Sequence, residues 1–133
     1  DYAHHPSEIK QSVLSIRELY KDKKITAIFQ PHLYTRTRDF YKDFASSLSL
    51  LDEVILVDIY PAREQPIPGV TSQLIYDNLR PGIEKCMCKK EEILNILENK
   101  SIEVLITLGA GDIDNYVPSI TEKLNTRLNK PQS

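Results

Sequence analysis

The sequence predicts an α/β fold, a Rossmann-like and mostly parallel sheet flanked by helices. Three short apolar runs, at 25–29, 54–57 and 102–108, have the composition of strands that are buried on both faces. Stretches with apolar residues at helical spacing separate these runs. Strands that alternate with helices form right-handed crossovers, so the sheet should be parallel, with helices on both faces. The 133 residues fit a single domain, 1–133.

The first half of the chain contains two predicted helices and two predicted strands. A helix begins at Pro6, because proline favours the first turn of a helix. The strand at 25–29 ends before Pro31, since proline cannot donate a hydrogen bond to a sheet. Aromatic and aliphatic residues four apart predict a helix at 38–48, and the strand at 54–57 follows it.

The second half begins with an irregular segment at 59–70, where three prolines and a glycine exclude regular structure. The remaining predicted elements are a short helix at 71–79, a weak strand at 85–88, a helix at 91–98, the strand at 102–108 and a last helix at 117–128. The tail after residue 129 should be frayed.

The composition excludes several classes of function. A formal charge of −2 and a pI near 5.9 argue against a nucleic-acid binder. No apolar run is long enough to span a membrane, and no secretory leader is present, so we expect a cytoplasmic protein. Cys86 and Cys88 are too close for an unstrained disulfide and lack partners for a zinc site. We therefore expect reduced thiols and no metal site in this chain.

Three polar loops should meet at one edge of the sheet. The segments 30–37, 58–64 and 109–112 each follow the carboxyl end of a strong strand. In a parallel sheet these ends share an edge, and ligands of such sheets bind beyond it. The sequence therefore predicts that the ligand site lies there.

The first of these loops is rich in groups that bind anions. Arg36 and Arg38 carry planar charged forks suited to carboxylate or phosphate, and hydroxyl side chains surround them. The amino end of a helix follows, and its free N–H groups attract anions. The alternative is a solvated turn in which Thr35 or Thr37 caps the helix.

Residues 1–6 are also polar and cannot be core. Asp1 can accept hydrogen bonds from ribose hydroxyls, His4 and His5 can donate to phosphate or sugar oxygens, and Tyr2 can stack on a ligand. A metal site and a plain polar terminus remain the alternatives.

The loop after the last strong strand contains Gly109 and Gly111, which contact a ligand or simply form a tight turn. Asp112 is expected to cap a helix, and Arg63 and Glu64 to form a surface pair. The chain lacks the phosphate-cradling, nucleophile-elbow and zinc-protease motifs, so we assign no catalytic residue to it.

Four segments match a known family in order and spacing. Residues 1–9 resemble the D-Y-[AG]-H-H-P-x-E-[IV] element that opens the C-terminal domain of Mur ligases. Residues 30–38 resemble the Q-P-H-R-Y-T-R-T-R segment of the family branch that joins L-alanine to UDP-N-acetylmuramate. Residues 60–64 and 109–113 resemble its Y-x-A-x-E and G-A-G-D-I elements.

This resemblance implies the last domain of a three-domain, cytoplasmic enzyme of peptidoglycan synthesis, without its N-terminal and central domains. ATP would phosphorylate the carboxylate of UDP-N-acetylmuramate, and the amine of L-alanine would attack the acyl phosphate. Mg²⁺ and the phosphate-cradling loop would belong mainly to the central domain, and the UDP group to the N-terminal one. The C-terminal domain would close over the site and exclude water. This chain alone is therefore expected to be inactive.

The resemblance also implies roles for single residues. Those that would contact ATP are Asp1, His4 and His5. Those that would contact L-alanine or UDP-N-acetylmuramate are Tyr2, His32, Arg36, Gly109 and Gly111. Arg36 would pair with the carboxylate of L-alanine. Leu33 stands where most members have arginine, so either Arg36 acts alone or Arg38 helps it.

Two alternatives stay open. The related ligase that recycles murein tripeptide onto UDP-N-acetylmuramate shares the opening element, although its second segment usually differs. A stand-alone module that binds nucleotides or anions without catalysis is the other.

Overall fold

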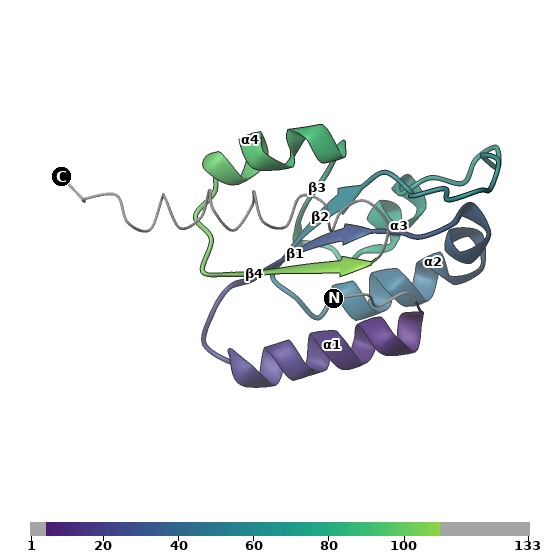
Figure 1. Ribbon diagram of the computed structural model, residues 1–133. Helices are drawn as coiled ribbons and strands as arrows, with labels where there is room; N and C mark the ends of the chain where they lie inside the picture. Colours follow the sequence, from purple (N-terminus) through teal and green to yellow (C-terminus); the bar gives the residue numbers. More distant parts are fainter. Residues whose placement is uncertain (1–4, 110–133) are drawn as a thin grey trace.

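The computed structural model describes residues 5–109, in which helices and parallel strands alternate (Figure 1). The helices are α1 (Pro6–Leu19), α2 (Tyr34–Leu48), α3 (Gln73–Asn78) and α4 (Ile93–Glu98), and a 3-10 turn, η1 (Lys90–Glu92), precedes α4. The strands are β1 (Ile25–Gln30), β2 (Glu53–Val57), β3 (Glu84–Cys88) and β4 (Val104–Gly109).

The four strands form one sheet in the order β3-β2-β1-β4, and every pair is parallel. The register aligns Ala27 of β1 with Val54 of β2 on one side and with Ile106 of β4 on the other. The predicted α/β class with a parallel sheet is therefore confirmed.

The direction of each crossover decides which face its helix covers. The chain moves outward from β1 through α2 to β2, and through α3 to β3, so right-handed connections put both helices on the same face. The return from β3 across the sheet to β4 runs the opposite way and puts α4 on the other face. Figure 1 shows α1 and α4 on opposite sides of the sheet.

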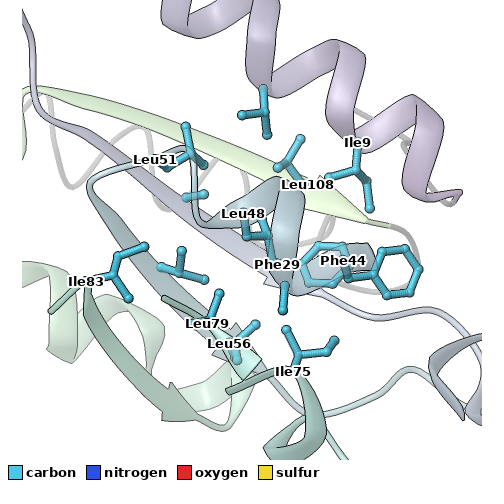
Figure 2. Packing of buried hydrophobic residues seen from close by; sticks show 14 of the residues in the cluster. Ile9, Phe29, Phe44, Leu48, Leu51, Leu56, Ile75, Leu79, Ile83 and Leu108 are labelled. Atoms are coloured by element: carbon cyan, nitrogen blue, oxygen red, sulfur yellow. The ribbon is translucent and has the colours of Figure 1, made fainter. Parts of the chain in front are cut away.

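Two apolar clusters, one on each face, hold the helices to the sheet. The larger joins α1, α2 and α3 to the sheet and contains Ile9, Phe29, Phe44 and Ile75 (Figure 2). The rings of Phe29 and Phe44 lie 5.4 Å apart at 53°. The smaller cluster joins α4 to β1, β2 and β3. Each fully buried large side chain contributes about 1.5–3 kcal/mol, and β1 is buried along its whole length.

The amino edge of the sheet is held by ion pairs. The Arg17 guanidinium donates to both carboxylate oxygens of Asp52, at 2.9 and 3.0 Å. The Asp52 carboxylate also accepts from the Ile25 N–H at 2.8 Å. Burial alone would raise the pKa of the nearby Glu53 carboxyl, but Lys100 and Thr26 donate to it and lower that pKa. This edge is opposite to the predicted ligand site and serves stability.

Most predicted elements are confirmed with shifts of one or two residues at their ends. The larger difference is α2, which begins at Tyr34 instead of at residue 38. Residues 34–37, expected in a loop, therefore form the first turn of a helix. The segment 59–70 contains no helix or strand, as predicted. The helix predicted at 117–128 lies outside the described residues.

Candidate functional site

The predicted site lies where β1 and β4 end side by side. The order of the strands reverses between these two, and ligands of such sheets bind at this switch point. Gln30 pairs with Gly109 at the last position of both strands. A β-carbon on Gly109 would lie 2.1 Å from the Gln30 carbonyl oxygen, and Gly109 has φ +103°. Glycine is therefore required there by the approach of the two strands, whether or not a ligand also touches it.

The loops that follow β1 and β2 continue the pairing of these strands beyond the sheet. The Tyr60 N–H donates to the Pro31 carbonyl at 2.8 Å, and the Leu33 N–H donates to the Tyr60 carbonyl at 2.9 Å. The ring of His32 stacks on that of Tyr60, with centroids 5.8 Å apart and planes at 15°. The imidazole is therefore held in one orientation at the edge of the sheet.

Leu33 carries an unusual backbone conformation at the start of α2, with φ 73° and ψ 138°. A residue other than glycine in this region costs about 1–3 kcal/mol. The Leu33 N–H donates to Tyr60, as described above. The Leu33 carbonyl accepts from the Thr37 N–H at 3.2 Å and from the Thr37 hydroxyl at 2.9 Å. These bonds keep the chain in the sharp bend that separates His32 from the helix.

Arg36 lies in the first turn of α2, four residues after His32. Its Nη1 is 3.4 Å from His32 Nδ1, and both side chains are half-buried. A guanidinium beside an imidazole can bind one carboxylate through charge-assisted hydrogen bonds. Arg38 does not complete this pair: it is exposed, and its Nε donates to Asp39 at 2.9 Å. Residues two apart on a helix do not face each other, so Arg38 does not lie beside His32 here.

The amino end of α2 is occupied by a carboxylate of the protein itself. Glu64 accepts from the Thr35 N–H at 3.1 Å and from the Thr35 hydroxyl at 2.5 Å. The Thr35 hydroxyl, and then the N–H groups of this turn, hold the pKa of Glu64 below its usual range. The expected surface pair of Arg63 with Glu64 is therefore wrong, since Glu64 binds the first turn of α2 instead.

The start of α1 lies near the same edge. The ring of His5 meets the ring of Phe40 edge-on, with centroids 6.4 Å apart, and Phe40 is one helical turn from Arg36. The Glu8 carboxylate accepts from the His5 N–H at 3.0 Å, which ties down the first turn of α1. Figure 1 shows the beginnings of α1 and α2 at the end of the sheet to which the strand arrows point.

The structure thus brings four of the predicted site residues to one end of the sheet: His5, His32, Arg36 and Gly109. The other four, Asp1, Tyr2, His4 and Gly111, lie outside the described residues. The prediction that the three loops share one edge of the sheet is therefore confirmed for the described part of each loop.

A cavity of about 490 Å³ adjoins this edge on the side of β2 and β3. Gln30, Asp58, Tyr60, Lys89 and Lys90 are among its lining residues. The Gln30 amide, one of these lining groups, donates to the Asp58 carbonyl at 3.3 Å. The two lysines were missed from the sequence, although they directly follow a strand and its carboxyl end places them here.

Neither cysteine takes part in this site. Cys86 and Cys88 are free thiols that pack with the cluster under α4. Burial raises the pKa of both, that of Cys88 to about 12. Within residues 5–109, no three histidine, cysteine or carboxylate side chains converge as metal ligands would. The described helices are also too short or too polar to cross a membrane.

Relatives of known sequence match nearly the whole chain. A protein named UDP-N-acetylmuramate--L-alanine ligase from Phocaeicola vulgatus is 84% identical over 127 residues, 96% of this chain and 28% of that protein. A protein of the same name from Parabacteroides distasonis is 57% identical over 131 residues. The chain spans about 28% of the length of these relatives.

Solved structures agree. The crystal structure of a UDP-N-acetylmuramate-alanine ligase from Thermotoga maritima matches 96% of this chain, and 26% of that one, with a TM-score of 0.73 and 28% identity. A murein peptide ligase from Psychrobacter arcticus matches with a TM-score of 0.74 at 14% identity, which shows the fold alone.

The sequence model of a protein family, described as the glutamate ligase domain of Mur ligases, matches residues 1–112, most of the chain. The resemblance that the motifs indicated is thereby confirmed, and the chain belongs to the Mur ligase family.

Proposed function

We propose that this chain is the C-terminal domain of a three-domain, ATP-dependent ligase that joins L-alanine to UDP-N-acetylmuramate in peptidoglycan synthesis. The observation that carries the proposal is the placement of Arg36 against His32 at the switch point of the sheet. The 84% identity to a relative of that name supports the same reaction. The chain spans only part of such relatives, so the N-terminal and central domains would be its partners.

Arg36 is the group that we assign to the carboxylate of L-alanine. The amino acid offers only a carboxylate, an amine and a methyl group for recognition. A charge-assisted hydrogen bond to the carboxylate contributes about 1.5–3 kcal/mol. Glu64 occupies the amino end of α2, so we assign the carboxylate to the Arg36 guanidinium, with the His32 ring beside it. Tyr2, Gly109 and Gly111 are proposed to complete the substrate site.

ATP would bind across the face that this domain presents to the central domain. His5 lies at the start of α1, where its imidazole can donate to phosphate or ribose oxygens. Asp1 and His4 are proposed to share this role. No three histidine, cysteine or carboxylate side chains converge among the described residues, and we assign Mg²⁺ mainly to the central domain. ATP dependence and free thiols are consistent with a cytoplasmic protein.

In the proposed reaction the bound amine attacks the acyl phosphate of UDP-N-acetylmuramate, and the tetrahedral intermediate loses phosphate to give the amide. This chain would orient the amine and shield the acyl phosphate from water. Without the phosphate-cradling loop of the central domain, the 133 residues alone are expected to form no product.

The experiment is phosphate release by the full-length protein with ATP, UDP-N-acetylmuramate and one of four acceptors: L-alanine, glycine, L-serine or murein tripeptide. The proposal expects the highest kcat/KM with L-alanine. Release only with the tripeptide would favour the recycling ligase. A gene that starts just before Asp1 would favour a stand-alone binding module.

A further inference from the structure

The loop between β2 and α3 is held at both ends and is tied to the beginning of α2 in between. Its far end is held where the buried Ser72 hydroxyl donates to the Val57 carbonyl at 2.6 Å. Its near end is held by the two backbone bonds of Tyr60 to the loop after β1. Between them, Glu64 binds both donors of Thr35. The loop is therefore cross-linked to the first turn of α2, which also carries Arg36.

Backbone strain is concentrated in this same unit. Among residues 5–109, the residues other than glycine with positive φ are Leu33, at 73°, and Ala62, at 53°. Leu33 begins the helix that carries Thr35, and Ala62 sits in the turn that presents Glu64. That turn is closed by the Glu64 N–H, which donates to the Pro61 carbonyl at 2.9 Å. Such strain persists only where the surroundings impose it, and it clusters at functional sites.

Building on the proposed function, we propose that Glu64 is a positioning residue for recognition of the amino acid. By holding Thr35 through two hydrogen bonds, it joins the loop that carries Tyr60 to the helical turn that carries Arg36. Tyr60 orients His32, and His32 lies against Arg36. Glu64 thereby sets both donors at the place where the carboxylate of L-alanine would bind, without touching it.

The charge of Glu64 has a second consequence. The amino end of a helix attracts anions, and a free one beside Arg36 would offer the substrate carboxylate a competing position. Because Glu64 fills that position, the substrate carboxylate is directed to the guanidinium. The sequence motif that contains Tyr60 and Glu64 then has a physical reason: one residue aligns the imidazole and the other fixes the turn.

The test uses Glu64→Ala in the full-length ligase, with steady-state kinetics for L-alanine and for ATP. Loss of the contact should raise the KM for L-alanine at least about tenfold, because a small misplacement of binding groups is costly. The KM for ATP should change less than about twofold. Thr35→Val should also raise the KM for L-alanine, whereas Thr35→Ser keeps the hydroxyl and should leave this KM near the wild-type value. Arg63→Ala, at an exposed neighbour, is the matched control.

A second readout needs no turnover. In the chain itself, the ring resonances of His32 should shift in Glu64→Ala and in Thr35→Val, and stay in place in Arg63→Ala and Thr35→Ser. Unshifted His32 resonances, or equal increases in the KM for both substrates, would overturn the positioning role. Failure of the proposed function would appear differently, as a wild-type protein that does not use L-alanine.

Discussion

Gly109 approaches Gln30 so closely that a β-carbon at position 109 would lie 2.1 Å from the Gln30 carbonyl oxygen. The clash is with backbone of the neighbouring strand, where β1 and β4 end, so it cannot be relieved by a rotation of a side chain. This contact places the last residue of β4 against the last residue of β1, and so sets where the loops beyond both strands begin.

Gly109→Ala is therefore expected to lower the free energy of unfolding by about 3 kcal/mol or more, through the clash and the positive φ together. Urea denaturation measures this. Gly82→Ala is the control, because Gly82 also has positive φ, at 86°, but open space around it. Strain alone should cost that variant about 1–2 kcal/mol. Equal losses in the two variants would contradict the close approach.

Leu33 offers a test of backbone strain at the candidate site. At an ordinary helical position alanine is more stable than glycine by about 0.5–1 kcal/mol. At position 33 the order should reverse, because glycine accepts φ 73° and alanine does not. We expect Leu33→Gly to exceed Leu33→Ala in free energy of unfolding by about 1 kcal/mol. The same pair of substitutions at the exposed helical Lys42 should show the ordinary order. The same order at both positions would exclude the strain.

The fold could be predicted because its signals are local. Runs such as 25–29 and 54–57 are apolar on both faces, which few structures other than a buried parallel strand allow. Helical spacing between them then left little choice of topology. The same reasoning placed the loops after β1 and β4 at one edge, where Gln30 and Gly109 indeed meet.

The start of α2 could not be predicted because its determinants are distant or unusual. Its first turn is stabilised by Glu64, which lies 29 residues from Thr35 in the sequence. The bend before it places Leu33 at positive φ, a conformation that is usually adopted by glycine, so the leucine gave no sign of a bend. Arg36 and His32 were predicted as site residues, but their contact follows only once the helix is known to begin at Tyr34.

The ion pair at the amino edge of the sheet predicts a dependence of stability on pH. The hydrogen bonds from Arg17 lower the pKa of the Asp52 carboxyl. A carboxyl with a lowered pKa in the folded state stabilises the protein above its unfolded pKa, near 4, and loses this contribution as the pH falls through the folded value. The free energy of unfolding should therefore decline from about pH 5 downward, and Asp52→Asn should flatten part of that decline.

The measurement is urea denaturation at several pH values between about 2.5 and 7. Asp22→Asn is the matched control, since Asp22 is exposed in the turn after α1. If the free energy of unfolding of Asp52→Asn falls with decreasing pH as steeply as that of the wild type, the pair of Asp52 with Arg17 contributes nothing to the loss of stability in acid.

Arg36 and Arg38 offer a matched pair of substitutions that tests the proposed carboxylate site, because the chain places one beside His32 and the other in solvent against Asp39. In the full-length protein, Arg36→Ala should raise the KM for L-alanine by tens-fold, which corresponds to a charge-assisted bond of about 1.5–3 kcal/mol. The KM for ATP should hardly change, because the lost contact is to the amino acid. Arg38→Ala should leave both KM values near those of the wild type. Steady-state phosphate release measures all of them. An unchanged KM for L-alanine in Arg36→Ala would remove Arg36 from the carboxylate site, and an equal rise in Arg38→Ala would mean that the two arginines act together after domain closure.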